Sequence, residues 1–273
     1  MSYWEEVEHY TDLAPIWMAH PLVRAAINTR VGGEASVWPV EALRRALGPR
    51  APLAETLSIG CGIGSLERSL IDEGVVQRIT AVDLSAPALD EARAQAGDRP
   101  VEYLLTDARQ YLREHRQTFD AIFFHQSLHH FDALDDLMEL LRDALQPGGL
   151  LYVDEYTGPS RDEWHWWRLV IPNLAYRLLP FGTRRARIVR APINHEDPTE
   201  ALRSSEIIRA IEKHFVITHR RDYGGNLLSV VYPNMKGGPA ATPGVSRLIV
   251  FEDWLLRLGA PSFYTVIHAE ARS

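Results

Sequence analysis

Three glycines that could bind a ligand follow a short apolar run in residues 57–65, Leu-Ser-Ile-Gly-Cys-Gly-Ile-Gly-Ser. Glycine lets the backbone turn sharply and lets a ligand reach main-chain N–H groups that a Cβ atom would block. We interpret Cys61, the only cysteine in the chain, as a small residue that fills this turn rather than as a reactive thiol. Gly60, Cys61, Gly62 and Gly64 are therefore predicted to contact a nucleotide-like ligand.

A carboxylate ends the next apolar run, Ile-Thr-Ala-Val-Asp at residues 79–83. Asp83 lies 23 positions after Gly60, close to the about 20 residues that separate a glycine turn from the acid that binds ribose hydroxyls. A carboxylate suits this role because it accepts hydrogen bonds from two adjacent hydroxyls. Leu84 follows Asp83 directly, and Ser85 is a typical N-cap for a helix that starts there.

Titratable side chains follow a further apolar run at residues 119–124. His125 and Gln126 come first and are placed to contact a ligand at the end of that run. His129 and His130 come just beyond them. Histidine titrates near neutral pH and so suits a general base. Helix capping or packing under the loop is the alternative for both histidines, and it is the favoured interpretation for His130.

Glu155 and Tyr156 follow the run at residues 150–154 and are the next candidates for proton transfer. A metal site is not predicted here. Asp154 and Glu155 are adjacent, and neighbours on a strand point to opposite faces. One cysteine also excludes a cysteine-based zinc site.

Strand and helix patterns alternate along this part of the chain. The apolar positions between residues 132 and 145 recur at i, i+3 and i+4, which predicts a helix. Such alternation favours a doubly wound, mostly parallel α/β sheet. Strands are predicted at residues 57–59, 79–83, 101–105, 119–124 and 150–154.

These segments together resemble the class I S-adenosylmethionine-dependent methyltransferases, in the family's order and spacing. The resemblance covers about residues 50–156 and implies a seven-stranded Rossmann-like sheet with S-adenosylmethionine as cofactor. Many relatives carry an acid two positions before the first glycine, where this chain has Ser58. The matching segments are Ile-Gly-Cys-Gly-Ile-Gly (59–64), Val-Asp-Leu-Ser (82–85), Thr-Asp-Ala (106–108), Phe-Asp (119–120) leading to Ser-Leu-His-His (127–130), and Leu-Gln-Pro-Gly-Gly (145–149).

The resemblance also implies roles for individual residues. The methionine part of the cofactor is expected over residues 60–64, its ribose on Asp83, and its adenine near Asp107 and Ala108. Relatives with a Leu-His segment after the fourth strand use that histidine beside the substrate, which maps onto His129. An NAD-binding turn would need Gly or Ala where this chain has Ser65, so it fits less well.

Composition favours a cytoplasmic enzyme with a small-molecule acceptor. The 273 residues carry a net charge of −7, so the chain lacks the excess of basic residues that is typical of nucleic-acid-binding proteins. We expect no membrane span, because apolar runs stay well under the roughly 18 residues that one needs. The first residues show no secretory signal, and one cysteine fits a reducing compartment. A homodimer is compatible with all of this.

We predict a single methyltransferase domain over residues 1–273. Its parts are a helical N-terminal cover (1–50), the cofactor-binding core (51–155), an insertion that covers the substrate (156–202), and the rest of the sheet (203–273). Strands are expected at residues 215–219 and 263–267, and the resemblance makes the last one antiparallel. The tryptophans of residues 1–50 could equally pack helices onto the sheet.

The insertion is the predicted place of acceptor selectivity. Trp164 and Trp167 offer aromatic faces for a sugar or a flat ring, although a core-facing stripe is an equal alternative. We predict O-methylation of a hydroxyl on a small molecule, such as a sugar or glycan precursor or a natural product. The alternatives are N- or C-methylation of a natural-product acceptor, or a protein that binds S-adenosylmethionine without catalysis.

Overall fold

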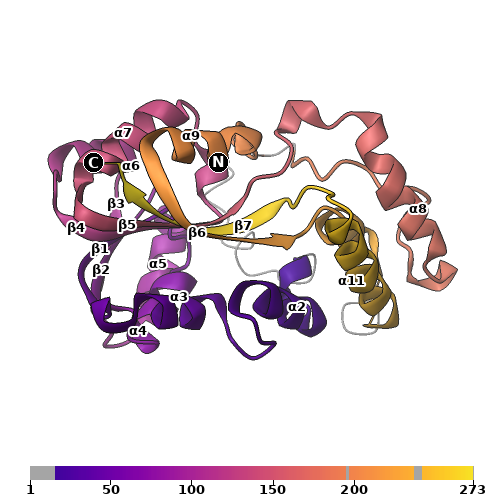
Figure 1. The fold of residues 1–273 in the computed structure, drawn as a ribbon, viewed down its shortest axis with the longest axis horizontal. Helices are drawn as coiled ribbons and strands as arrows, with labels where there is room; N and C mark the ends of the chain where they lie inside the picture. The colour runs from indigo at the N-terminus through magenta and orange to yellow at the C-terminus, as the bar shows by residue number, and fades with distance from the viewer. Residues whose placement is uncertain (1–15, 195–196, 237–241, 273) are drawn as a thin grey trace.

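The apolar runs pair into one seven-stranded sheet in the order β3-β2-β1-β4-β5-β7-β6 (Figure 1). This computed structural model describes residues 16–194, 197–236 and 242–272. Strand β7 is antiparallel to both neighbours, and the other pairings are parallel, so the predicted mostly parallel doubly wound sheet is confirmed. The strands are β1 (Leu53–Ile59), β2 (Val76–Asp83), β3 (Val101–Leu105), β4 (Phe119–His125), β5 (Leu145–Tyr156), β6 (Phe215–Gly224) and β7 (Tyr264–Ala271).

The strand order reverses between β1 and β4, and this reversal positions the site. Ile59 at the end of β1 pairs in register with Phe124 near the end of β4. The glycine turn and the histidines beyond β4 therefore leave the sheet side by side. Ligands of open α/β sheets bind at the carboxyl ends of strands at such a reversal.

Helices cover both faces of the sheet and give it two separate cores (Figure 1). Leu137 and Leu141 of α7 are fully buried, as the helical spacing predicts. One face carries α2 (Pro21–Gly32), α3 (Pro39–Leu47), α4 (Ser65–Asp72) and α5 (Ala86–Ala96), and the other carries α6 (Ala108–Glu114), α7 (Leu134–Ala144) and α9 (Ile207–His214).

The segment after β5 forms short helices instead of one long run. Helix α8 (Val170–Leu178) lies with α11 (Thr242–Arg257) at the end of the molecule opposite β3 (Figure 1). In the described parts of the chain, no helix combines the length and the apolarity that crossing a bilayer requires. The remaining short helices are η2 (Trp17–Ala19), η3 (Gly48–Arg50), η4 (Leu128–His130), η5 (Arg161–Glu163), η6 (Trp166–Leu169), η7 (Phe181–Thr183), η8 (Ser204–Glu206), α10 (Leu228–Val231) and η9 (Tyr232–Asn234).

The predicted N-terminal cover lies partly outside the described residues, which begin at position 16. Within the described part, α2 and α3 pack on a face of the sheet, where Val23 and Leu43 are fully or almost fully buried. They therefore support the core, and of this segment only Trp17 reaches a cavity at the carboxyl edge.

A buried carboxylate on α11 fixes the turn that follows β6. Oε1 of Glu252 accepts hydrogen bonds from the backbone N–H groups of Gly225, Leu227 and Leu228, each at 3.0 Å. Its Oε2 pairs with Arg30 of α2 at 2.9 Å. One side chain thus joins α2, α11 and the turn.

Replacing Glu252 by Ala should destabilise the fold by about 3–5 kcal/mol, because Arg30 loses its buried carboxylate partner and three buried amides lose their acceptor. Asp253→Ala is the matched control. Asp253 also pairs with Arg30, at 2.7 Å, but its side chain is 40% exposed, so we expect a loss of about 1 kcal/mol or less. Denaturant unfolding of both variants measures the difference, and equal losses would contradict an anchoring role for Glu252.

Candidate functional site

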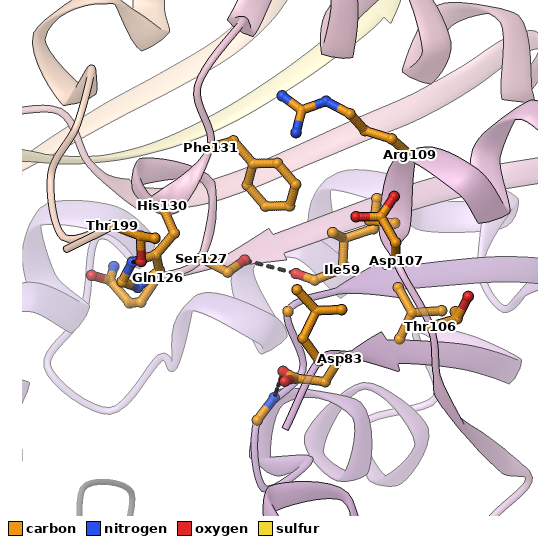
Figure 2. A pocket seen from close by; sticks show the side chains of 15 residues that line it. Ile59, Asp83, Thr106, Asp107, Arg109, Gln126, Ser127, His130, Phe131 and Thr199 are labelled. Atoms are coloured by element: carbon orange, nitrogen blue, oxygen red, sulfur yellow. Dashed lines mark hydrogen bonds between the residues drawn. The ribbon is translucent and has the colours of Figure 1, made fainter. Parts of the chain in front are cut away.

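Three adjoining cavities lie at the carboxyl ends of β1, β2, β3 and β4. The β2–β3 cavity, of about 250 Å³, is lined by Gly60, Gly62, Asp83, Leu84, Thr106, Asp107, Ala108, Arg109, Gln126, Ser127, His130, Phe131 and Thr199, among others (Figure 2). The glycine-turn cavity, of about 490 Å³, is lined by Ser58, Gly60, Cys61, Gly62, Glu67, His125 and Gln126, among others. The aromatic cavity, of about 150 Å³, is lined by Trp17, Gln126, His129, Tyr156, Arg161, Trp164, Glu200, Ser229 and Tyr264, among others.

The glycine turn needs its glycines for close approach. Gly60 has φ of 69°, and a Cβ atom there would lie 2.5 Å from Cβ of Ser127. Gly64 also has a positive φ, and a Cβ atom there would collide with the Tyr103 hydroxyl. Backbone therefore forms the wall shared by two cavities, while Gly64 lets the turn pack against β3.

Asp83 ties the glycine turn to the start of α5. Its Oδ2 accepts a hydrogen bond from Gly62 N–H at 2.8 Å (Figure 2). Its Oδ1 accepts one from Ser85 N–H at 2.8 Å. Burial raises the pKa of the Asp83 carboxyl, and the hydrogen bonds from backbone N–H groups, which lower the pKa, do not offset this rise. The sequence predicted only a ligand contact for this residue, and the structure adds a role in holding the turn.

Apolar walls of the β2–β3 cavity suit a flat ring. Leu84 is 68% exposed although it lines the cavity. Phe131 also lines the cavity (Figure 2), and the Arg109 guanidinium packs over the Phe131 ring at 5.4 Å. Asp107 lines the cavity and also caps α6 by accepting a hydrogen bond from Gln110 N–H. Arg109 and Phe131 were not predicted, because no sequence spacing links them to the glycine turn.

Glu67 is a buried acid in the glycine-turn cavity that the sequence analysis missed. It is 1% exposed on the first turn of α4. The Ser58 hydroxyl donates a hydrogen bond to its Oε1, and its Oε2 has no partner among the described residues. Burial raises the Glu67 pKa, and the hydrogen bond from Ser58, which lowers the pKa, does not offset this rise.

Cys61 is an unreactive thiol in the same cavity. Burial and the nearby carboxylates of Glu67 and Asp83 raise its pKa well above the ordinary range. Only a thiolate is a strong nucleophile. The structure therefore favours the interpretation of Cys61 as a small residue that fills the turn.

Gln126 is common to the three cavities. Its backbone is left-handed, with φ of 54°, a conformation that costs energy for a residue other than glycine. Its Nε2 donates to the Asp154 carbonyl at 3.2 Å and to the Tyr223 hydroxyl at 3.3 Å. His125 beside it pairs with Asp154 at 3.2 Å.

The structure brings His129 and Glu155 together. Glu155 is completely buried, and its Oε1 lies 2.5 Å from Nδ1 of His129. The same carboxylate accepts hydrogen bonds from the backbone N–H groups of Ser127, Leu128 and Tyr156. With four donors around it, Glu155 positions the imidazole and has little capacity to act as a base itself.

The far side of the His129 ring faces a second acid. Its Nε2 lies 3.7 Å from Oε2 of Glu200. Burial alone would lower the pKa of His129, but the Glu155 and Glu200 carboxylates hold the proton and raise the pKa to about 10. Burial raises the pKa of Glu200, yet hydrogen bonding to His129 brings it below its ordinary value.

His130 belongs to a different cavity from His129. It lines the β2–β3 cavity, with Nδ1 at 3.2 Å from the Thr199 hydroxyl and 3.4 Å from Asp197. Burial and the neighbouring His129 charge lower its pKa to about 4, so it is neutral at physiological pH. The two adjacent histidines thus differ in charge.

Four tryptophan and tyrosine side chains line the third cavity. Trp164, one of the two predicted acceptor contacts, lines it, whereas Trp167, the other, is 53% exposed and is not among its lining residues. The Tyr156 hydroxyl donates to the Pro159 carbonyl, and burial holds its pKa well above the ordinary range, so Tyr156 acts as a wall rather than a base. Trp17 and Tyr264 pack with ring centroids 5.1 Å apart.

Glu200 and Thr199 come from a segment that no motif marked. This segment crosses the site because Leu202 N–H bonds to the His129 carbonyl at 3.2 Å and Arg161 N–H bonds to the Ala201 carbonyl at 2.9 Å. The predicted absence of a metal site stays a prediction. Among the described residues, potential ligand atoms of His129, His130 and Glu200 lie within 4.8 Å of one another and could hold an ion.

Residues 57–153 match the family model described as a methyltransferase domain. Two curated relatives are similar over part of their length. An uncharacterized methyltransferase of Mycobacterium tuberculosis is 30% identical over 124 residues, which is 45% of this chain and 61% of the relative. A ubiquinone biosynthesis O-methyltransferase of Thiobacillus denitrificans is 29% identical over 140 residues, 49% of this chain and 58% of the relative. The chain thus spans about three fifths of these relatives.

A solved structure has a similar fold. Geranyl diphosphate C-methyltransferase from Streptomyces coelicolor, in complex with Mg²⁺, geranyl diphosphate and S-adenosyl-L-homocysteine, superposes with a TM-score of 0.54 at 18% identity. The alignment covers 85% of this chain and 78% of that protein. At this identity the likeness concerns the fold.

Gly60→Ala should destabilise the protein more than Gly74→Ala. Both glycines have left-handed backbones, with φ of 69° and 64°, so each variant incurs about 1 kcal/mol of backbone strain. Only at position 60 does the new Cβ atom also meet Ser127, since nothing lies within 4 Å of that atom at position 74. Denaturant midpoints test the difference, and equal midpoints would refute a close approach at Gly60.

Proposed function

We propose that this chain, in which residues 57–153 match a methyltransferase domain, is a class I S-adenosylmethionine-dependent enzyme that methylates a hydroxyl group on a small acceptor bound in the aromatic cavity. S-adenosylmethionine, when bound, supplies a methyl group on a positively charged sulfur. The observation that carries the proposal is the position of Gln126, which lines the two cavities suited to the cofactor and also the aromatic cavity. A methyl donor and an acceptor could therefore meet beside it.

The chain's own residues fit this cofactor on two counts. Gly60 and Gly62 leave backbone as the wall shared by the β2–β3 and glycine-turn cavities. The buried Glu67 oxygen lacks a described partner, which suits the cofactor's ammonium group. Asp83 and Leu84, with Asp107 and Ala108, would hold the adenosine part.

Glu67 takes over, in our proposal, the role of the acid that many relatives carry at the position of Ser58. Ser58 cannot carry charge, but its hydroxyl holds one Glu67 oxygen and so leaves the other directed to a ligand. An ammonium group would both pair with this oxygen and offset the cost of burying the carboxylate.

Glu67→Gln should weaken binding of S-adenosylhomocysteine by about 1.5–3 kcal/mol, the scale of a hydrogen bond to a charged group. Binding of 5′-methylthioadenosine, which lacks the amino-acid part, should be unchanged. Glu73→Gln, which alters an exposed acid just after α4, is the control. Titration calorimetry separates the outcomes. If the wild type does not bind S-adenosylhomocysteine, the cofactor assignment is rejected. If the wild type and Glu67→Gln bind it with equal affinity, only the role of Glu67 is rejected.

His129 is the proposed general base. Its Nε2 faces the aromatic cavity, while Glu155 holds Nδ1 and stabilises the ring when it gains a proton. A hydroxyl is a weak nucleophile while protonated, so moving its proton to Nε2 should be worth about 10²–10⁴ in rate. A cationic ligand bound beside Gln126 would lower the raised His129 pKa, since like charges disfavour each other.

The rate should rise with pH, because the active form of His129 is the unprotonated one. The sequence predicted this rise near neutrality, but the two carboxylates shift it upward. We expect kcat/KM for a hydroxyl acceptor to increase from neutral pH toward about 10. Glu155→Gln should move the rise to lower pH and reduce the maximal rate, while His129→Ala should lose about 10²–10⁴ in turnover.

Initial rates over this pH range test the assignment, with S-adenosylhomocysteine affinity as a check that both variants still bind the cofactor. An unchanged pH profile in Glu155→Gln, or near-full activity in His129→Ala, would rule out His129 as the base. Activity lost on chelation and restored by a divalent ion would instead point to a metal held by His129, His130 and Glu200.

Amine methylation is the second candidate, and one observation favours it. The pKa of Glu200 is lowered, so an anionic carboxylate stands among the rings of Trp17, Tyr156 and Trp164. A carboxylate among aromatic rings is an environment that suits a cationic group. A panel of hydroxyl, amine and carbon acceptors distinguishes the reactions. Glu200→Gln should raise KM for an amine much more than for a hydroxyl compound, and cofactor binding without any turnover would favour a non-catalytic protein.

A further inference from the structure

Large apolar side chains stand in solvent along residues 164–190. Leu174, Leu178 and Phe181 are 57%, 78% and 85% exposed. Soluble proteins rarely leave so many neighbouring apolar side chains uncovered unless the surface binds something. The other exposed members are Trp166, Trp167, Val170, Ile171 and Ile188.

Helix α8 gives four of these side chains a common outer face. Positions 170, 171, 174 and 178 recur at the helical spacing of three and four. Pro172, Ala175 and Tyr176 on the other side are buried against the rest of the protein. The helix lies at one extreme of the molecule (Figure 1), and its outer face is not covered by any described part of the chain, so it can meet a flat surface.

The same segment concentrates positive charge. Residues 164–190 contain six arginines and no Asp or Glu, within a chain of net charge −7. Arg184 is used internally, since it donates to the carbonyls of Arg177 and Leu179. Arg177, Arg185, Arg187 and Arg190 are exposed.

We propose that the surface of residues 164–190 docks onto an anionic phospholipid bilayer, with its apolar side chains in the headgroup region and its arginines on lipid phosphates. Tryptophan, leucine and phenylalanine beside arginine are the composition of helices that lie in a membrane interface. Guanidinium groups match phosphate geometry. A second copy of this chain fits less well, because a two-fold contact would bring the arginine clusters of both copies together.

The surface adjoins the proposed acceptor cavity. Trp164 at its start and Ile193 just after its end both line the aromatic cavity. If the proposed function holds, the acceptor's hydroxyl can belong to a molecule that partitions into lipid. Membrane docking itself does not depend on that function and is measured without turnover.

Sedimentation with vesicles tests the proposal on the full chain. Vesicles of equal parts phosphatidylglycerol and phosphatidylcholine should bind the protein at low salt, and binding should weaken as salt rises. Pure phosphatidylcholine should bind it at least tenfold more weakly. The triple change Leu174→Gln, Leu178→Gln, Phe181→Gln and, separately, the pair Arg185→Gln, Arg187→Gln should each lose roughly tenfold or more.

Matched controls remove similar groups elsewhere. Val216→Gln changes an exposed apolar residue on β6, and Arg113→Gln with Arg209→Gln removes two exposed arginines from other helices. Both should bind vesicles like the wild type, and circular dichroism checks that every variant is folded. Absence of binding at low salt, or equal binding by the variants, overturns the proposal. A dimer that the triple change dissociates, without vesicle binding, would identify a second copy as the occupant.

Discussion

The buried carboxylate of Glu155 is the contact on which the site depends. It stands at the end of β5 and takes hydrogen bonds from the backbone beyond β4 and from the imidazole of His129. An unpaired carboxylate could not be buried at this depth without a large penalty, so the anion and its donors must form together. This arrangement directs Nε2 of His129 toward the aromatic cavity and leaves His130 beside the neighbouring one.

Negative charge gathers around the place where the cavities meet. Glu67, Asp83, Glu155 and Glu200 come from four separate parts of the chain and converge on the carboxyl edge of the sheet. Burial raises the pKa of Glu67 and of Asp83. A cationic ligand relieves this cost, so the charge pattern of the site suits a sulfonium donor. It also explains why a carboxylate in α4 can keep one oxygen that has no partner among the described residues.

Two regions of the molecule differ in the charge they carry. The four acids of the site lie at the sheet edge, whereas residues 164–190 form an arginine-rich, apolar surface at the far end of the fold (Figure 1). The aromatic cavity has walls from both the sheet and the segment that carries the surface. In our proposals, one region is suited to lipid and the other to a charged small molecule.

The local pattern of the sequence determined the sheet and much of the cofactor side of the site. Strand periodicity, the glycine turn and the spacing to Asp83 depend on neighbours in the chain, and the strand order confirms the doubly wound fold they predict. Tertiary structure alone decided the rest. Glu67 and Glu200 carry no motif, because their partners Ser58 and His129 lie in other elements. The upward shift of the His129 pKa likewise comes from two acids brought in from β5 and from the segment before α9. Trp164 and Trp167 look alike in sequence, but only packing decides which one meets the cavity, since Trp164 follows η5 and Trp167 belongs to the next short helix, η6.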